Sequence, residues 1–239
     1  MMQIPKMILF DYGGTLIHEE PFDGVKGTAA LLKHATQNKY HLSAARIQEE
    51  ASKLNHELGR WDVNGEHKLG FEIPHYAFSA YLYESLGIRF DLPPSRLEEI
   101  FWDNASPAVP MPGISDLLAA LREKNIRTGV ISNISYSHDS LYRRIRRLLP
   151  EHDFEFIIAS SEYVFRKPNV RIFRLALEKA SLSADEVWFA GDRYGADIVG
   201  ARNAGLTPVW YTREKTDSPG VIRIGDWADL RILLGTLES

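Results

Sequence analysis

The stretch Phe10-Asp-Tyr-Gly-Gly-Thr-Leu16 decides the fold, because it joins an apolar run to an acidic, glycine-rich turn. Residues 6–11 form a short, mainly apolar segment that is typical of a strand buried in a parallel sheet. The two glycines allow a tight turn and a close approach of the backbone to a ligand. Asp11 is therefore a candidate functional carboxylate at a strand end, although an aspartate near glycine also occurs in ordinary turns.

Beyond this stretch the sequence changes from a helical to an alternating pattern. Apolar residues recur near helical spacing in residues 24–36, 43–61, 75–86 and 94–104. Residues 106–113 contain three prolines and a glycine, which indicates a linker or boundary. After it we expect helices at 114–124, 137–149, 170–180 and 195–204 and from 227 onward, alternating with strands at 128–132, 154–159, 186–190, 208–211 and 221–224.

This alternation predicts an α/β fold, a Rossmann-like doubly wound parallel sheet with helices on both faces. The first strand is expected to join the later sheet. Residues 1–16 and 110–239 would then form the core domain, and residues 17–109 an inserted all-α helical domain.

The composition excludes several classes of protein. The 239 residues, 44% hydrophobic and 25% charged, are ordinary for a soluble globular protein, and the net charge of -4 gives no electrostatic case for nucleic-acid binding. The absence of cysteine excludes disulfides and thiolate nucleophiles and fits a reducing cytoplasm. No signal-peptide pattern and no run of about 20 apolar residues is present, so we expect a cytoplasmic protein without a membrane partner, either a monomer or a homodimer.

Three further groups of polar residues lie at expected strand ends or helix starts. Asp192 and Asp197, in Gly191-Asp-Arg-Tyr-Gly-Ala-Asp197, could face one hard cation such as Mg²⁺, or could simply cap a helix. Ser132 and Asn133 close a strand and could hold phosphate oxygens, or form a turn. Lys167, before Pro168, could neutralise a phosphate, although a surface lysine is common there.

Taken together and in this order, the motifs resemble those of the haloacid dehalogenase (HAD) superfamily, in its phosphatase-like members with a helical cap. The matching pieces are Phe10-Asp-Tyr-Gly-Gly-Thr-Leu16, Val130-Ile-Ser-Asn133, Arg166-Lys-Pro168 and Gly191-Asp192 through Asp197-Ile198-Val-Gly-Ala-Arg-Asn-Ala-Gly205. The resemblance covers essentially the whole chain and makes residues 17–109 the cap.

The resemblance implies a Mg²⁺-dependent hydrolase of small phosphorylated metabolites. Asp11 would attack the phosphoryl group and form an aspartyl-phosphate that water then hydrolyses. The metal ligands would be Asp11, the carbonyl of Gly13 and Asp192, with Asp197 as a ligand or as a support for a metal-bound water. Ser132 and the N–H of Asn133 would bind phosphoryl oxygens, and Lys167 would balance the charge of nucleophile and phosphate.

One position departs from the family pattern. Similar phosphatases carry a second aspartate two residues after the nucleophile, where it protonates the leaving group, whereas this chain has Gly13. Because general acid–base assistance is worth about 10²–10⁴-fold, we expect weak activity on poor leaving groups unless another residue substitutes. His18 is one candidate, and Tyr12 is expected to point away from Asp11.

Three alternative functions remain. A dehalogenase of the same superfamily also lacks the second aspartate, but it would not need the pair Asp192 and Asp197. A phosphonate hydrolase would need a cap lysine, for which Lys26 and Lys33 are available. A non-enzymatic protein could bind a phosphorylated ligand with an impaired site.

Overall fold

The computed structural model describes residues 3–60, 68–214 and 219–237. Its centre is a six-stranded sheet in which every neighbouring pair is parallel, in the order β10-β9-β8-β1-β6-β7. The strands are β1 (Met7–Phe10), β6 (Arg127–Ser132), β7 (Ile157–Ala159), β8 (Val187–Gly191), β9 (Thr207–Tyr211) and β10 (Ile222–Ile224). The first strand joins this sheet, as the sequence predicts, and the structure places it between β8 and β6.

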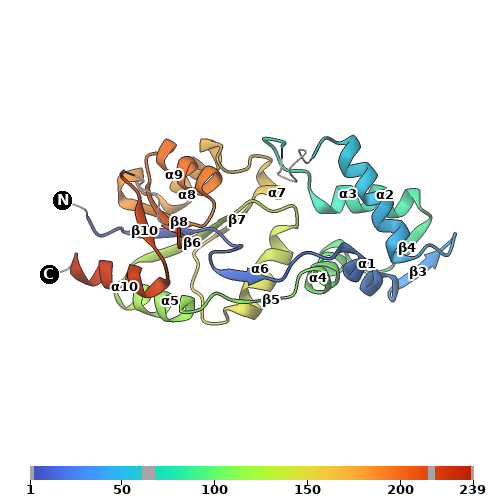
Figure 1. Cartoon of the computed structure of the whole chain (residues 1–239), viewed down its shortest axis with the longest axis horizontal. Coiled ribbons are helices and arrows are strands. Elements are labelled where there is room, and N and C mark those ends of the chain that lie inside the picture. The colour runs from blue at the N-terminus through green and yellow to red at the C-terminus, as the bar shows by residue number, and fades with distance from the viewer. Residues whose placement is uncertain (1–2, 61–67, 215–218, 238–239) are drawn as a thin grey trace.

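Helices cover both faces of this sheet, and the alternation of side chains along β1 explains why (Figure 1). Ile8 and Phe10 pack in the cluster that includes α5, α6 and α10, whereas Met7 and Leu9 pack in the one that includes α8 and α9. The helices of this lobe are α5 (Ile114–Glu123), α6 (His138–Leu148), the short α7 (Ser160–Tyr163), α8 (Val170–Ala180), α9 (Val199–Asn203) and α10 (Trp227–Thr236).

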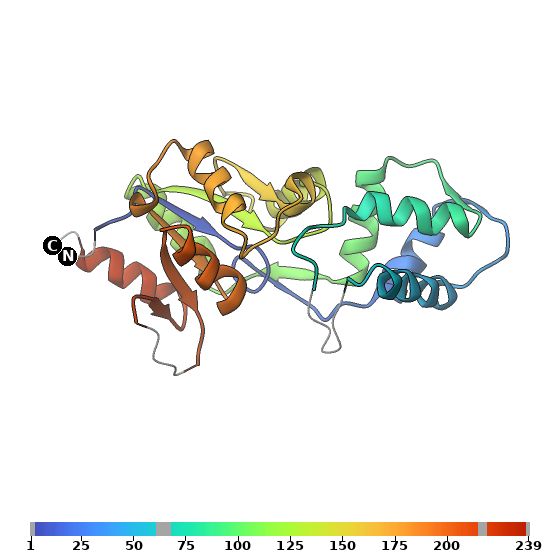
Figure 2. The same cartoon turned by 90° about the horizontal axis from the view of Figure 1, so that it is seen from above.

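The segment between β1 and α5 forms a second lobe at the far end of the molecule from both termini (Figure 2). It contains α1 (Gly24–Leu32), α2 (Ala44–Glu57), α3 (His75–Ser85) and α4 (Pro94–Ala105). Two antiparallel strands, β2 (Ile17–Glu19) and β5 (Ala108–Pro110), pair where the chain leaves the sheet lobe and returns to it.

The second lobe is not entirely helical, so the all-α expectation for residues 17–109 is wrong in this respect. The helix expected at 24–36 ends at Leu32, and β3 (Ala35–Asn38) pairs with β4 (Ile88–Phe90). Long-range strand pairing overrides the helical spacing there. The helix expected at 43–61 ends at Glu57 within the described residues, and its predicted end at Trp61 lies outside them.

Two further elements differ from the sequence prediction. The strand expected at 154–159 is reduced to Ile157–Ala159, because β7 is an edge strand that pairs only with Val130–Ser132 of β6. The helix expected at 195–204 begins as a π-helical turn, Tyr194–Ile198, which continues into α9.

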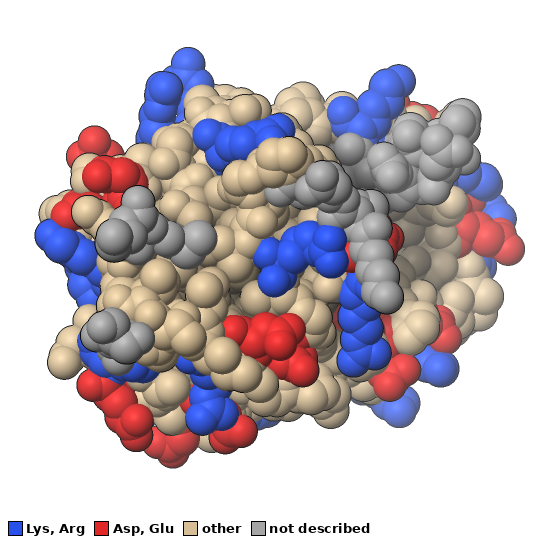
Figure 3. Space-filling view, turned by 60° about the vertical axis from the view of Figure 1, so that its left-hand side comes forward, with Lys and Arg blue, Asp and Glu red and all other residues tan. Residues whose placement is uncertain are grey.

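Within the described residues, no helix is long and apolar enough to cross a membrane. On the face drawn in Figure 3, acidic and basic side chains are interspersed, so that neither sign dominates that surface.

Packing of α9 against α8 gives a stability prediction. A Cβ added at Gly200 would lie 2.6 Å from the Phe173 ring and 3.0 Å from the backbone of Pro168. Gly200→Ala should therefore lower the free energy of unfolding in urea by about 1–3 kcal/mol. The matched control is Gly195→Ala, where no atom lies within 4 Å, and which should leave stability unchanged or raise it by up to about 1 kcal/mol. Equal losses for both variants would contradict this account of the packing.

Candidate functional site

The polar residues singled out in the sequence meet at the carboxyl edge of the sheet. Asp11 follows β1, Ser132 ends β6 and Asp192 follows β8, and these three strands are neighbours. Ligands of open parallel sheets bind beyond this edge. The strand order therefore brings Asp11 together with residues that lie more than 100 positions further along the sequence.

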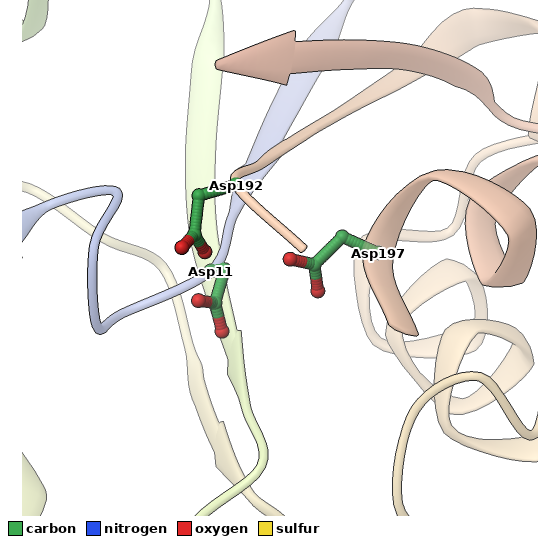
Figure 4. Close-up of side chains that lie close together, drawn as sticks. All are labelled: Asp11, Asp192 and Asp197. Carbon is green, nitrogen blue, oxygen red and sulfur yellow. The ribbon is translucent and has the colours of Figure 1, made fainter. Parts of the chain in front are cut away.

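Three carboxylates form the centre of the site (Figure 4). Asp11, Asp192 and Asp197 each offer one oxygen, and these oxygens all lie within 4.8 Å of one another. Asp11 and Asp197 are buried and Asp192 is half-buried. Carboxylate oxygens in this arrangement suit a hard divalent cation such as Mg²⁺.

Lys167 is the cation that the protein itself supplies to this cluster. Its Nζ lies 2.5 Å from Oδ1 of Asp11 and 2.7 Å from Oδ1 of Asp197, and its side chain is only 1% exposed. Asn133 holds the lysine backbone, because its side chain accepts from the Lys167 N–H and donates to the Lys167 carbonyl. The sequence predicted Lys167 and Asn133 as site residues but not this contact between them.

Burial and the crowding of carboxylates together shift the pKa values in this site. Burial raises the pKa of Asp11 to about 7, with Lys167 acting against this shift and Asp197 and Asp192 adding to it. Burial and the neighbouring Asp197 also raise the pKa of Asp192. Burial would lower the pKa of Lys167, but Asp11 and Asp197 outweigh it and raise that pKa. One ammonium does not balance three carboxylates, so the donor set fits a divalent cation.

The first turn positions Asp192. Gly14 has a φ of 72°, and a Cβ at this position would lie 2.5 Å from Oδ2 of Asp192, so a larger residue is excluded there. The buried Thr15 hydroxyl donates to Oδ1 of Asp192 over 3.4 Å. Sequence reasoning did not single out Thr15 as a contact of the carboxylate cluster, although it belongs to the quoted first motif.

Asp197 differs from the other two carboxylates because both of its oxygens have protein partners. Oδ1 contacts Lys167, and Oδ2 accepts from the backbone N–H of Arg193 over 2.9 Å. This arrangement is suited to holding Lys167 and the turn after β8 in place.

A cavity of about 790 Å³ opens onto these residues. Ser132 and Asn133 line it at the sheet edge, and no described residue forms a hydrogen bond with the Ser132 hydroxyl. Residues of the second lobe line the opposite side, among them Arg60, His75, Phe78, Tyr83, Phe101 and Trp102. The volume of the cavity is that of a typical small-molecule site.

The remaining sequence candidates lie in different places. Gly13 lines the cavity and forms a bridge with Ile17. His18 lies on β2 with an exposed side chain and also lines the cavity. Lys26 and Lys33 are exposed and are absent from the cavity wall that the described residues form, which removes the support for an imine-forming lysine.

Sequence reasoning also missed a buried arginine that contacts the first motif. Arg144 donates to the hydroxyl of Tyr12, whose ring is buried in the core, and forms ion pairs with Glu19 and Asp103. The apolar spacing of residues 137–149 signalled a helix, but nothing local indicated that this helix presents a buried arginine.

Comparison with known families gives one match that spans most of the chain. The profile of the haloacid dehalogenase-like hydrolases matches residues 5–205. A glyceraldehyde 3-phosphate phosphatase of Methanothermobacter thermautotrophicus is 34% identical over 110 residues, which are 46% of this chain and 47% of the relative. Pyrimidine 5'-nucleotidase YjjG of Escherichia coli is 34% identical over 139 residues, 57% of this chain and 60% of the relative. The chain thus spans only about half to three-fifths of these relatives.

Solved structures with the same fold cover nearly the whole chain. A HAD phosphatase from Thermococcus onnurineus has a TM-score of 0.63 at 23% identity and covers 96% of this chain and 97% of its own. A 2-haloacid dehalogenase from Pseudomonas syringae has a TM-score of 0.65 at 20% identity and covers 98% of this chain and 99% of its own. These two proteins are named for different activities, so the shared fold does not decide between a phosphatase and a dehalogenase activity for this chain.

The raised pKa of Asp11 predicts how cation binding depends on pH. A proton competes with a metal for this carboxylate, so binding weakens as the pH falls below about 7. Between pH 8 and pH 6 we expect a roughly tenfold loss of Mg²⁺ affinity in isothermal titration calorimetry. An affinity that is equal at both pH values would contradict the assignment of Asp11 as a ligand.

Proposed function

The chain belongs to the haloacid dehalogenase-like hydrolases, and we propose that it hydrolyses small phosphate monoesters through an aspartyl-phosphate on Asp11, with Mg²⁺ as cofactor. The observation that carries this proposal is the buried cluster of Asp11, Asp192 and Asp197 with Lys167 bound to two of its members. A carboxylate held between a cation and a candidate metal site is prepared for nucleophilic attack on a phosphoryl group.

Asp11 is the proposed nucleophile. Lys167 binds its Oδ1, whereas Oδ2 has no hydrogen-bond partner among the described residues. An oxygen of Asp11 forms a bond to phosphorus while the bond from phosphorus to the leaving alcohol breaks. Water then attacks the same phosphorus, inorganic phosphate leaves, and the Asp11 carboxylate is regenerated.

The metal ligands follow from the same cluster. Asp11, Asp192 and the carbonyl of Gly13 would hold Mg²⁺, which when bound neutralises charge on the phosphoryl group. Asp197 already uses both oxygens in protein contacts, which favours a supporting role for it over direct ligation. It would orient Lys167 and the turn that carries Asp192.

The phosphoryl oxygens would be bound by groups of the sheet lobe. The Ser132 hydroxyl lines the cavity and lacks a partner among the described residues, so it is available to donate. The Asn133 side chain is engaged with Lys167, which leaves its backbone N–H for the phosphate. Lys167 would stay in contact with Asp11 and balance the charge that builds up in the transition state.

Residues 17–109 are the proposed cap, which together with the sheet lobe encloses the substrate. The support is that the cavity wall combines side chains of both lobes. The curated relatives bear the names of phosphatases of glyceraldehyde 3-phosphate and of pyrimidine nucleotides, which supports a phosphate monoester as the substrate class. The aromatic rings on the cap side favour a monoester whose organic part has apolar surface.

A second candidate function is binding of a phosphorylated ligand without turnover. Gly13 favours it, because this position supplies no proton donor for the leaving group. The buried ion pairs of Lys167 favour chemistry, since a simple phosphate-binding site needs no carboxylate at the nucleophile position.

Replacement of the nucleophile tests the proposed reaction. With Mg²⁺ and 4-nitrophenyl phosphate, whose leaving group needs little protonation, Asp11→Asn should lower kcat by at least about 10³-fold. Chelation by EDTA should abolish turnover by the wild-type protein, and added Mg²⁺ should restore it. The control is Asp185→Asn, which changes an exposed carboxylate and should leave the rate unchanged. Full activity of Asp11→Asn would rule out the covalent mechanism.

A further inference from the structure

We propose that Glu19 is the general acid–base residue of this site and works from the space that a side chain at position 13 would otherwise occupy. The inference rests on the proposed function and deepens it. It resolves the difficulty that Gly13 creates for substrates with poor leaving groups.

The position of the carboxylate is the first argument. Apart from the two residues next to Gly13 in the sequence, the one atom within 4 Å of a Cβ built on Gly13 is Oε2 of Glu19, at 3.6 Å. An aspartate at position 13 would extend its own carboxyl group from that point. Glu19 therefore brings the missing chemical group to the same region from six residues further along the chain.

The local fold explains how Glu19 reaches this region. The N–H of Gly14 donates to the carbonyl of Ile17, and Gly13 bridges with Ile17, so the chain folds back over the first turn. Strand β2 then runs antiparallel to β5. Alternation along β2 puts Ile17 and Glu19 on one side and the exposed His18 on the other. Both Glu19 and His18 line the cavity, but no atom of His18 lies within 4 Å of a Cβ built on Gly13. This geometry favours Glu19 over His18 as the proton donor.

The two oxygens of Glu19 have different surroundings. Oε1 accepts from Nε1 of Trp102 over 2.8 Å and from Nη2 of Arg144 over 3.2 Å. Oε2 has no hydrogen-bond partner among the described residues, and Glu19 lines the cavity. One oxygen thus fixes the carboxyl group while the other remains available to a substrate.

Arg144 is itself held firmly, which makes it a rigid support. Its side chain is 3% exposed, its Nε donates to the Tyr12 hydroxyl over 2.9 Å, and its guanidinium lies over the Trp102 ring at 4.3 Å. These contacts hold the Glu19 carboxyl group in one orientation, with Oε2 toward the cavity.

The proton balance of the reaction is then complete. As the bond from phosphorus to the leaving oxygen breaks, Glu19 gives its proton to that oxygen, and a neutral alcohol leaves. The Glu19 carboxylate next accepts a proton from the water that attacks the aspartyl-phosphate on Asp11. This returns Glu19 to its protonated form and Asp11 to its carboxylate.

Glu19→Gln tests this role, because the amide oxygen can still accept from Trp102 and Arg144 but the side chain cannot transfer a proton. We compare kcat on 4-nitrophenyl phosphate and on an alkyl phosphate, glycerol 1-phosphate, both with saturating Mg²⁺. The variant should lose about 10²–10⁴-fold on the alkyl substrate and less than tenfold on the aryl one. Glu84→Gln, the same change at an exposed residue of α3 outside the cavity wall, should alter neither rate.

A second variant separates proton transfer from a structural role. Adding Gly13→Asp to Glu19→Gln should raise kcat on the alkyl phosphate at least tenfold above that of Glu19→Gln alone, because it returns a carboxyl group to the same space. Equal losses on both substrates without this recovery, or unchanged rates in Glu19→Gln, would overturn the role of Glu19. If His18→Gln, and not Glu19→Gln, lost kcat on the alkyl phosphate while keeping it on the aryl phosphate, the role of Glu19 would also be overturned. Wild-type protein that hydrolyses neither substrate would overturn the proposed function and this inference with it.

Discussion

The ion pairs of Lys167 with Asp11 and Asp197 are the interaction on which the site depends. Three carboxylates meet at the edge of a buried sheet, where isolated negative charges are costly. One ammonium, itself almost fully buried, offsets part of that cost and fixes the geometry. The remaining negative charge is what the proposed divalent cation would neutralise.

A second group of buried charges joins the two lobes. Arg144, on α6 of the sheet lobe, contacts Tyr12 beside the first strand and Glu19 and Asp103 of the second lobe. Glu72 of the second lobe forms ion pairs with Arg166 of the sheet lobe. Breaking such buried pairs typically costs about 3–5 kcal/mol, so they hold the two sides of the cavity in a defined relation. The cavity wall therefore depends on charges that are distant from the reacting atoms.

The proposed role of Glu19 at the position left open by Gly13 depends on its place in space and less on its place in the chain. A proton donor needs only to reach the leaving oxygen in a suitable orientation. A tight turn and a short strand pair bring the Glu19 carboxyl group to the space beside Gly13. The contacts that orient it come from Trp102 and Arg144, which belong to helices far along the sequence.

The parallel α/β sheet, the membership of the first strand in it and the polar residues at strand ends could be predicted from the sequence alone, whereas the neighbours of the first strand came from the structure. The predicted features follow from local periodicity and from the rule that carboxyl ends of parallel strands share one edge. The sequence did not reveal β3 and β4, because pairing between residues about 50 positions apart leaves no local signal. The contact of Asn133 with Lys167, the buried Arg144 and the approach of Glu19 to Gly13 were likewise decided only by tertiary structure. Each joins segments whose separation in the sequence says nothing about their distance in space.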